Sequence, residues 1–236
     1  MKSVLASIVV MTAVVVTAAS TQNAPPATGT DIYHVMFTKA APGQAAELAK
    51  VLVTPDTTAP MPEHFIVLRH QEGDDWDYVV IQHLGPKAEV VGTPPAQNPA
   101  RPLTAWHNDT FASGPGWGEF SKQMAIGGSA GSGSPVYVIG VHRAVAGHRE
   151  QLQAALSAPG GASDKIESGN VLLQHVEGAD WNLMTLTRYN SWQDLGNDRA
   201  GLSSASASTP GGWADIRQHS AFHRDTIADR LFPVAK

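Results

Sequence analysis

Residues 69–76 read Arg-His-Gln-Glu-Gly-Asp-Asp-Trp, and residues 174–181 read Gln-His-Val-Glu-Gly-Ala-Asp-Trp. Five of these eight aligned positions are identical, including the Glu-Gly pair and the closing Trp. A short polar run centred on glycine, between two runs rich in β-branched residues, is typical of a hairpin turn. The sequence therefore predicts the same hairpin twice.

Two further blocks repeat in the same order. Ile32-Tyr33-His34-Val35 aligns with Val136-Tyr137-Val138-Ile139, and Trp106-His107-Asn108-Asp109-Thr110 aligns with Phe222-His223-Arg224-Asp225-Thr226. Three collinear blocks indicate a duplicated unit. The stretch 125–134 between the copies is rich in Gly and Ser, as flexible linkers are. We therefore expect one unit over residues 31–124 and a second over 135–236.

Each copy shows the same pattern of elements. Runs of strand length cover 32–38 and 136–142, and apolar residues at helical spacing follow each run. The repeated hairpin then supplies a second and a third strand. We expect a second helix around 103–111 and around 214–231, with a short last strand that the pattern does not locate. This order, β-α-β-β-α-β, is the ferredoxin-like arrangement, so we expect two tandem α+β units.

Two ferredoxin-like units in one chain resemble a tandem member of the dimeric α/β-barrel superfamily. The first strands followed by Ala-Pro-Gly at 41–43 and Val-Ala-Gly at 145–147, and then by an amphipathic helix, are similar to NIPSNAP-like and EthD-like members. The resemblance implies two four-stranded sheets that face each other as an intramolecular barrel, with ligand pockets between a sheet and its helices. The superfamily includes cofactor-free monooxygenases, polyketide cyclases, haem-degrading enzymes and haem-binding chlorite dismutases. No catalytic residue is carried over from any of these branches.

Composition excludes several kinds of chemistry. The 236 residues carry 16 Lys+Arg against 21 Asp+Glu, a net charge of −5, so no basic surface favours nucleic acid. With no cysteine, the chain has no disulfide, thiolate metal site or cysteine nucleophile. Dinucleotide-binding, P-loop and nucleophile-elbow motifs are also absent from the sequence.

The N-terminus has the three parts of a secretory signal. Lys2 is followed by an apolar run over 4–16 and by the small residues Thr17-Ala18-Ala19. The run is shorter than the ~20 apolar residues that span a bilayer, although a membrane anchor is the alternative. We therefore expect removal of residues 1–19, a flexible leader over 20–30, and export to a bacterial periplasm or beyond.

His107 and His223 occupy equivalent positions in the two copies, each in an aromatic-His-x-Asp-Thr motif. Histidine is the side chain best suited to proton transfer near neutral pH. We predict that these two residues are the catalytic bases, and the alternative is a structural role retained after duplication. On the expected helix, the Asp two residues after each His would not face it.

Asp215, His219 and His223 follow one another at a spacing of four. On one helix this spacing would stack three ligands suitable for zinc or another divalent ion. A solvated helix face is the alternative interpretation.

Other polar and aromatic residues recur near the predicted strand and helix ends. His83 and Arg188 are matched cationic positions on the third strands, and either can bind an anionic substrate group or pair with a carboxylate. Trp106 and Phe222 precede the paired histidines and are candidate pocket walls, with core packing as the alternative. Trp76 and Trp181 favour the core, and His70 and His175 favour a structural bond to the hairpin turn.

The sequence thus predicts an exported protein that binds a small apolar or aromatic molecule. Both a monomer and a homo-oligomer are compatible with the sequence. As an enzyme it would be a cofactor-free oxygenase, isomerase or cyclase. Haem binding through a histidine, as in chlorite dismutases, and a non-catalytic binding or scaffold module are the two alternatives.

Overall fold

The structure, a computed structural model, describes residues 29–57, 59, 61–86, 99–127, 134–158, 166–204 and 210–234. The predicted signal peptide, most of the leader and the centre of the predicted linker lie outside these residues. The first half contains the elements β1 (Asp31–Ala40), α1 (Ala45–Leu52), β2 (Phe65–Glu72), β3 (Tyr78–Pro86), the 3₁₀ turn η1 (Arg101–Leu103), β4 (Thr104–Gly114) and α2 (Trp117–Gln123). The second half contains β5 (Val136–Ala144), α3 (Arg149–Ser157), β6 (Gly169–Glu177), β7 (Leu183–Tyr189), α4 (Trp192–Ser204), α5 (Trp213–His219) and β8 (Ser220–Phe232).

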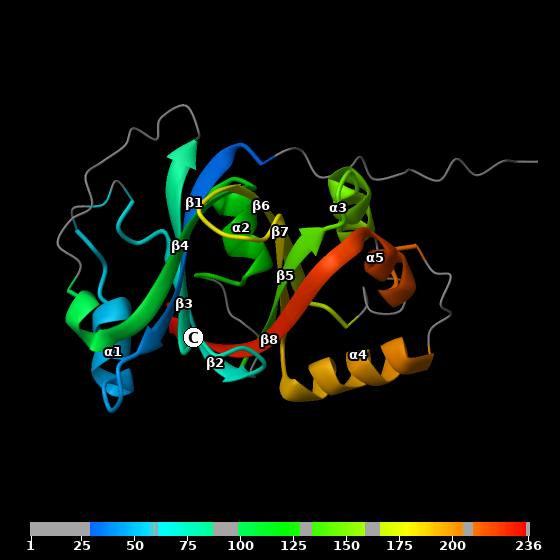
Figure 1. Cartoon of the computed structure of the whole chain (residues 1–236). Helices are drawn as coiled ribbons and strands as arrows, with labels where there is room; N and C mark the ends of the chain where they lie inside the picture. The colour runs from blue at the N-terminus through cyan, green and yellow to red at the C-terminus, as the bar shows by residue number, and fades with distance from the viewer. Residues whose placement is uncertain are drawn as a thin grey trace, which may run out of the picture.

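All eight strands form one closed antiparallel barrel in the order β1-β3-β2-β8-β5-β7-β6-β4 (Figure 1). Within each half the order is that of a ferredoxin-like sheet, β4-β1-β3-β2 and β8-β5-β7-β6. The halves join at two seams, where β2 pairs with β8 and β6 pairs with β4. The predicted α+β class and the tandem ferredoxin-like architecture are therefore confirmed.

The barrel interior is filled by apolar side chains from both halves. Alternate residues of β1 and β5, such as Tyr33, Val35 and Ile139, point inward and are almost fully buried. Trp76 and Trp181 belong to the same buried cluster, as predicted. Helix α2 supplies Phe120, which stacks on Tyr33 with ring centroids 5.1 Å apart. In Figure 1, helices α3, α4 and α5 lie on one side of the barrel and α1 on the other.

The hairpin prediction is confirmed, and both turn glycines have a positive φ angle. Gly73 and Gly178 have φ angles of 124° and 113°, a region that side chains with a Cβ rarely adopt. Each turn also contacts the other half of the chain. A Cβ on Gly73 would lie 2.5 Å from the backbone oxygen of Asp225, and one on Gly178 would lie 2.4 Å from that of Asp109. Glycine at these positions lets the hairpins close against the opposite half.

Two predicted helices are wrong. The stretch 103–111 lies almost entirely in strand β4, and 214–231 divides into the short helix α5 and the 13-residue strand β8. Each of these strands bonds two neighbours, β4 to β1 and β6, and β8 to β5 and β2. The backbone bonds of a strand with two partners outweigh the weak helical spacing of the local sequence. These are the last strands that the sequence pattern did not locate.

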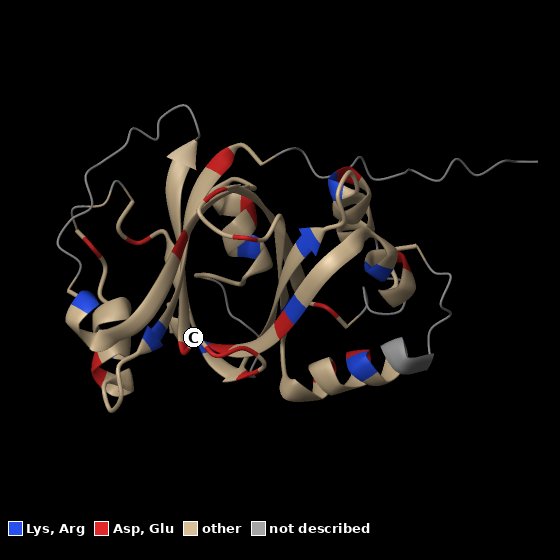
Figure 2. Cartoon of the chain, in the orientation of Figure 1, with Lys and Arg blue, Asp and Glu red and all other residues tan. Residues whose placement is uncertain are grey.

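Charged residues are sparse on this barrel. Figure 2 shows positive and negative residues interspersed along the strands and helices, without a broad area of one sign in this view. Among the described residues, no helix has the length and apolarity needed to cross a bilayer.

Candidate functional site

The second half carries a polar cluster on the outer face of its sheet. His142 of β5 and His223 of β8 are directly paired in the strand register, and their rings stack with centroids 5.6 Å apart. Asp225 and Gly140 form another pair in the same ladder, and Thr185 of β7 lies opposite Gly140. We refer to these five residues, Gly140, His142, Thr185, His223 and Asp225, as the polar layer.

The strand conformation brings the His and Asp of the repeated motif together. Residues two apart share one face of a strand, so His223 and Asp225 both point outward from the barrel. His223 Nε2 lies 3.7 Å from Asp225 Oδ2. Arg199 of α4 places its Nη2 3.9 Å from the same carboxylate oxygen. The polar layer therefore lies between the sheet and its covering helices, where the resemblance placed ligand pockets.

Gly140 makes room for the polar atoms around it. A Cβ at this position would lie 2.6 Å from Thr185 Oγ1, 2.8 Å from His142 Nε2 and 3.0 Å from Asp225 Oδ1. Three hydrogen-bonding atoms from three strands thus converge on the space that a side chain would fill. Glycine at this position therefore lets the three polar atoms approach the backbone, where a Cβ would collide with them.

Several buried atoms of this region have no hydrogen-bond partner in the described part of the chain. They are Nδ1 and Nε2 of His142 and Nδ1 of His223. A buried polar atom without a partner costs about 1–3 kcal/mol, so a group of them calls for water or a ligand.

Burial also sets the protonation of His142. Desolvation is the main cause that lowers its pKa to about 4, and the nearby charges of His223 and Arg217 lower it further, against the opposing effect of Asp225. His142 is therefore neutral at pH 7. Its ring can donate one hydrogen bond and accept another, but it is a weak base.

The first half provides an internal comparison. At the positions equivalent to Gly140, His142 and Thr185 it has Met36, Thr38 and Val80. Met36 is buried in an apolar cluster with Leu48, Leu52, Phe65 and other side chains. At the position of Gly140 the first half thus packs a buried apolar side chain, whereas the second half has polar side chains around a glycine.

His107 belongs to a different cluster, on the outer face of the first half. Its Nε2 lies 3.1 Å from Asp109 Oδ2, and His34 Nε2 lies 2.9 Å from Asp109 Oδ1. The bond from His34 is the main cause that lowers the pKa of Asp109. His107 and Asp109 are each more than 40% exposed, so this cluster is accessible to water. Of the two predicted bases, His223 is the less exposed, at 21% against 45% for His107, and it lies beside the buried His142.

The matched residues His83 and Arg188 are both buried and bonded within the protein. His83 Nε2 lies 2.7 Å from Asp31 Oδ2, and its Nδ1 lies 3.2 Å from His64 Nδ1. Arg188 donates to the backbone oxygens of Gln123 and Ser168. Their predicted contact with substrate stays a prediction, and their geometry shows an internal bonding role.

The predicted aromatic walls lie on the barrel side of their strands. Trp106 packs against the barrel core, and Phe222 lies beneath the guanidinium groups of Arg143 and Arg224, at 5.6 and 5.4 Å from its ring centroid. Neither belongs to the polar layer.

The predicted metal ligands do not share one helix face. Helix α5 ends at His219, which pairs with Asp215 at 3.7 Å and with His148 at 3.0 Å between the Nδ1 atoms. His223 lies beyond the helix, in β8. Across the described ranges, no group of three His, Asp or Glu side chains could hold a metal ion.

Sequence reasoning missed His142, Asp225, Thr185 and Gly140 as parts of the site. A signal for Asp225 was present, because the alternation His-x-Asp places both groups on one face if the segment is a strand. The substitution of Met36 by Gly140 between the two aligned copies was a second signal.

Comparisons with known proteins agree on the fold. No protein-family model matches the chain, and no curated protein matches it. Among solved structures, a "putative monooxygenase" from Fusobacterium nucleatum superposes with a TM-score of 0.58 at 7% identity, over 86% of this chain and 93% of its own. An "anthrone oxidase-like protein" gives a TM-score of 0.54 at 12% identity, over 86% and 92%. A "putative monooxygenase" from Lactobacillus acidophilus gives 0.52 at 10% identity, over 85% and 94%.

At such low identity these likenesses show the fold alone. The chain has the fold of the dimeric α/β-barrel superfamily, with both ferredoxin-like units in one polypeptide. No branch of the superfamily is singled out.

Proposed function

We propose that the polar layer of the second half binds a small, largely apolar or aromatic molecule and removes a proton from it. The observation that carries this proposal is the gathering of polar side chains around Gly140, where three buried histidine nitrogens of His142 and His223 have no partner among the described residues. The buried histidine nitrogens without partners supply the groups that such a ligand would bond.

His223 is the proposed general base. Its Nδ1 has no protein partner in the described residues, while Asp225 faces its Nε2 at 3.7 Å. In the ligand complex this pair closes to hydrogen-bond distance, so that Asp225 stabilises the imidazolium formed when Nδ1 takes the proton. His142, neutral at pH 7, donates a hydrogen bond to the ligand oxygen on which negative charge develops. Because these nitrogens are shielded from water, ligand access requires the helices above them, α4 and α5, to shift.

The fold neighbours suggest which molecule to test first. Anthrone carries an acidic C–H bond opposite its carbonyl, and loss of that proton gives an aromatic oxyanion. The anion then reacts with O2, and the net reaction converts anthrone and one O2 into anthraquinone and one water. A C–H acid of this kind needs a base and an oxyanion-stabilising donor, the roles that we assign to His223 and His142.

The test separates proton removal from oxidation. Under argon, exchange of the acidic anthrone proton for deuterium is followed by NMR in the wild-type protein and in His223→Ala, with His107→Ala as the matched variant from the first half. We expect His223→Ala to lose roughly 10²–10⁴-fold in exchange rate, the range typical of a general base, and His107→Ala to match the wild type. Equal rates in the wild type and His223→Ala, or an equal loss in both variants, would contradict the proposal.

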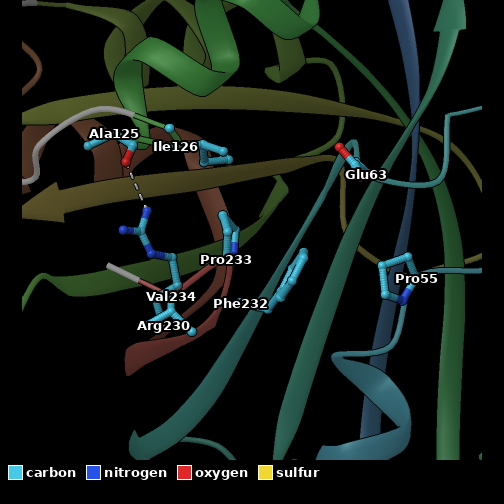
Figure 3. Close-up of a pocket in the computed structure, with 9 residues that line it drawn as sticks. Pro55, Glu63, Ala125, Ile126, Arg230, Phe232, Pro233 and Val234 are labelled. Atoms are coloured by element: carbon cyan, nitrogen blue, oxygen red, sulfur yellow. Dashed lines mark hydrogen bonds between the residues drawn. The ribbon is translucent and has the colours of Figure 1, made fainter. Parts of the chain in front are cut away.

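The alternatives give different outcomes. Saturable binding of anthrone without exchange would leave a non-catalytic binding module. Haem is the second alternative, and the polar layer with its two histidines would be its site, because the cavity shown in Figure 3, at the end of β8, has no histidine in its walls. A Soret band after addition of haem, lost in His142→Ala or His223→Ala, would favour haem binding over proton removal.

A further inference from the structure

Outside the polar layer, three titratable side chains of the first half are joined by hydrogen bonds in a row. Asp31 begins β1, His83 lies on the neighbouring strand β3, and His64 directly precedes β2. His83 Nε2 lies 2.7 Å from Asp31 Oδ2, and His83 Nδ1 lies 3.2 Å from His64 Nδ1. We refer to Asp31, His83 and His64 as the triad.

Burial decreases along the triad toward His64. Asp31 and His83 are 9% and 3% exposed, whereas His64 is half-buried. The backbone N–H of His83 donates to the backbone oxygen of His64 at 2.8 Å, and the His64 ring stacks on Trp117 of α2 with centroids 4.7 Å apart. These contacts hold the His64 ring in one orientation, with its Nδ1 facing His83.

The bonding pattern sets the position of the proton on each neutral ring. As a carboxylate, Asp31 only accepts hydrogen bonds, so His83 carries its proton on Nε2 and its Nδ1 is an acceptor. The donor in the bond between the two rings is then Nδ1 of His64. Neutral His64 therefore has a lone pair on Nε2. In the described part of the chain, this atom makes no hydrogen bond and is not among the buried atoms without a partner.

His64 is a free base at pH 7. Burial is the main cause that lowers its pKa, and the charge of His83 lowers it further, against the opposing effect of Glu63. A neutral imidazole is the form that acts as a nucleophile. When Nε2 forms a covalent bond, the ring becomes positively charged. Transfer of its Nδ1 proton to His83 then moves that charge beside the Asp31 carboxylate.

The second half folds without any of these groups. At the positions equivalent to those of the triad it has Pro135, Gly169 and Arg188. Strands β5, β7 and β6 nevertheless pair in the same order as β1, β3 and β2. The architecture therefore does not require the triad. Buried titratable groups that a fold does not need indicate a chemical role.

We infer that the triad is a second catalytic site, in which His64 is the nucleophile for hydrolysis of aryl esters of small carboxylic acids. A nucleophile, a proton acceptor and a carboxylate, each within hydrogen-bond distance of the next, form the arrangement that activates nucleophiles in hydrolytic enzymes. His64 is the catalytic residue, whereas His83 and Asp31 act through it as positioning residues. The substrate is an aryl ester because imidazole displaces an aryloxide readily and an alkoxide poorly.

The reaction has two steps. His64 Nε2 attacks the carbonyl carbon, the bond from this carbon to the aryloxide oxygen breaks, and the Nδ1 proton passes to His83. Water then attacks the acyl group, the bond to Nε2 breaks, and the proton returns from His83 to Nδ1. The net reaction converts one ester and one water into one carboxylate, one aryloxide and two protons.

The test uses p-nitrophenyl acetate and the full-length protein at pH 7, with release of p-nitrophenolate followed by absorbance. We expect the wild type to exceed free imidazole at equal concentration by at least about tenfold, and His64→Gln to lose at least about tenfold of the wild-type rate. His148→Gln is the matched variant and should keep the wild-type rate. His148 also bonds a second histidine, His219, through Nδ1 atoms 3.0 Å apart, but Asp215 lies 3.7 Å from that second ring.

The acyl intermediate and the tautomers supply readouts besides the rate. After an acid quench, peptide mapping should place the acetyl group on His64. Two-bond ¹H–¹⁵N spectra of the wild type should show neutral His64 with its proton on Nδ1 and neutral His83 with its proton on Nε2. Asp31→Asn should slow acetylation of His64 at least about tenfold, because the carboxylate that stabilises the transferred proton is lost. If this buried variant does not fold, the wild-type tautomers and the His64→Gln rate decide alone.

Several outcomes would overturn the inference. They are acetylation at another residue, an unchanged rate in His64→Gln, an equal loss in His148→Gln, and a wild-type rate no higher than that of free imidazole. Neutral His64 with its proton on Nε2 would overturn it as well. Because the acetyl group is located on His64, in the other half from His223, failure of ester hydrolysis is distinct from failure of proton removal at the polar layer.

Discussion

At the scale of single residues, His142 links the site to stability. Its side chain is almost fully buried, and its pKa of about 4 lies below the value of 6.5 for an unfolded chain. The folded state thus disfavours the protonated form. The stabilisation that neutral His142 gives to the folded state is fully present above pH 6.5 and is lost as the pH falls from there toward 4.

The first prediction is a difference in pH dependence between the wild type and His142→Thr, the residue found at the equivalent Thr38. The gap between 6.5 and about 4 corresponds to roughly 3 kcal/mol of unfolding free energy. The unfolding free energy, measured with urea, should fall between pH 7 and pH 4.5 more in the wild type than in the variant. The difference between the two falls should be most of that amount. Parallel losses in both proteins would mean that His142 titrates normally.

At the scale of elements, the two sheet–helix layers differ in what they hold. Met36 and Val80 pack in an apolar cluster of the first half, and the Thr38 hydroxyl bonds the backbone oxygen of Trp106. In the second half, both ring nitrogens of His142 are buried without a partner among the described residues. A polar layer that costs stability is expected where function requires it.

The second prediction is that the combined change His142→Thr and Thr185→Val stabilises the protein and abolishes ligand binding. Removal of the unsatisfied His142 nitrogens should raise the unfolding free energy by about 1–3 kcal/mol. Thermal unfolding and anthrone binding measure the two effects. Loss of stability together with retained binding would show that the second layer is packed differently from the first.

The third prediction concerns the hairpin turns. Gly73→Ala places a Cβ 2.5 Å from the backbone oxygen of Asp225, while Gly43→Ala, also at positive φ, meets nothing within 4 Å. Both substitutions carry the strain of that conformation, about 1–2 kcal/mol. In chemical denaturation, Gly73→Ala should lower the unfolding free energy clearly more than Gly43→Ala does, because the close contact between the hairpin and β8 must also widen. Equal losses of unfolding free energy in the two variants would mean that the hairpin does not contact β8 closely.

At the scale of the whole molecule, the barrel closes within one chain. The seams β2–β8 and β4–β6 pair the edges that each half-sheet would otherwise leave open. The fourth prediction is therefore a monomer: light scattering should give the mass of one chain at all concentrations tested. A stable dimer would show that another surface associates, as the sequence left open.

The fifth prediction concerns export, which rests on residues outside the described ranges. Expression of the full sequence in a bacterium with a general secretion pathway should give a product in the periplasm or medium that begins at Ser20. Intact-mass measurement checks the cleavage, and a product that retains residues 1–19 at the membrane would favour the anchor instead.

The sequence by itself determined the duplication, the first three strands and the first helix of each half, and the glycine turns. These features depend on local alternation, helical spacing and positive φ, which neighbouring residues specify. His223 was also identified from its repeated motif, although its environment was not.

Only the tertiary structure decided the last strands and the site. Strands β4 and β8 exist because each has two partners, one of them in the other half of the chain, and such pairing leaves little local signal. With 220–232 in a strand, His223 and Asp225 share a face and meet His142 and Gly140 from β5, more than eighty residues earlier. The position of a proton acceptor among buried neighbours is a property of strand register, and register is set by pairing across the whole barrel.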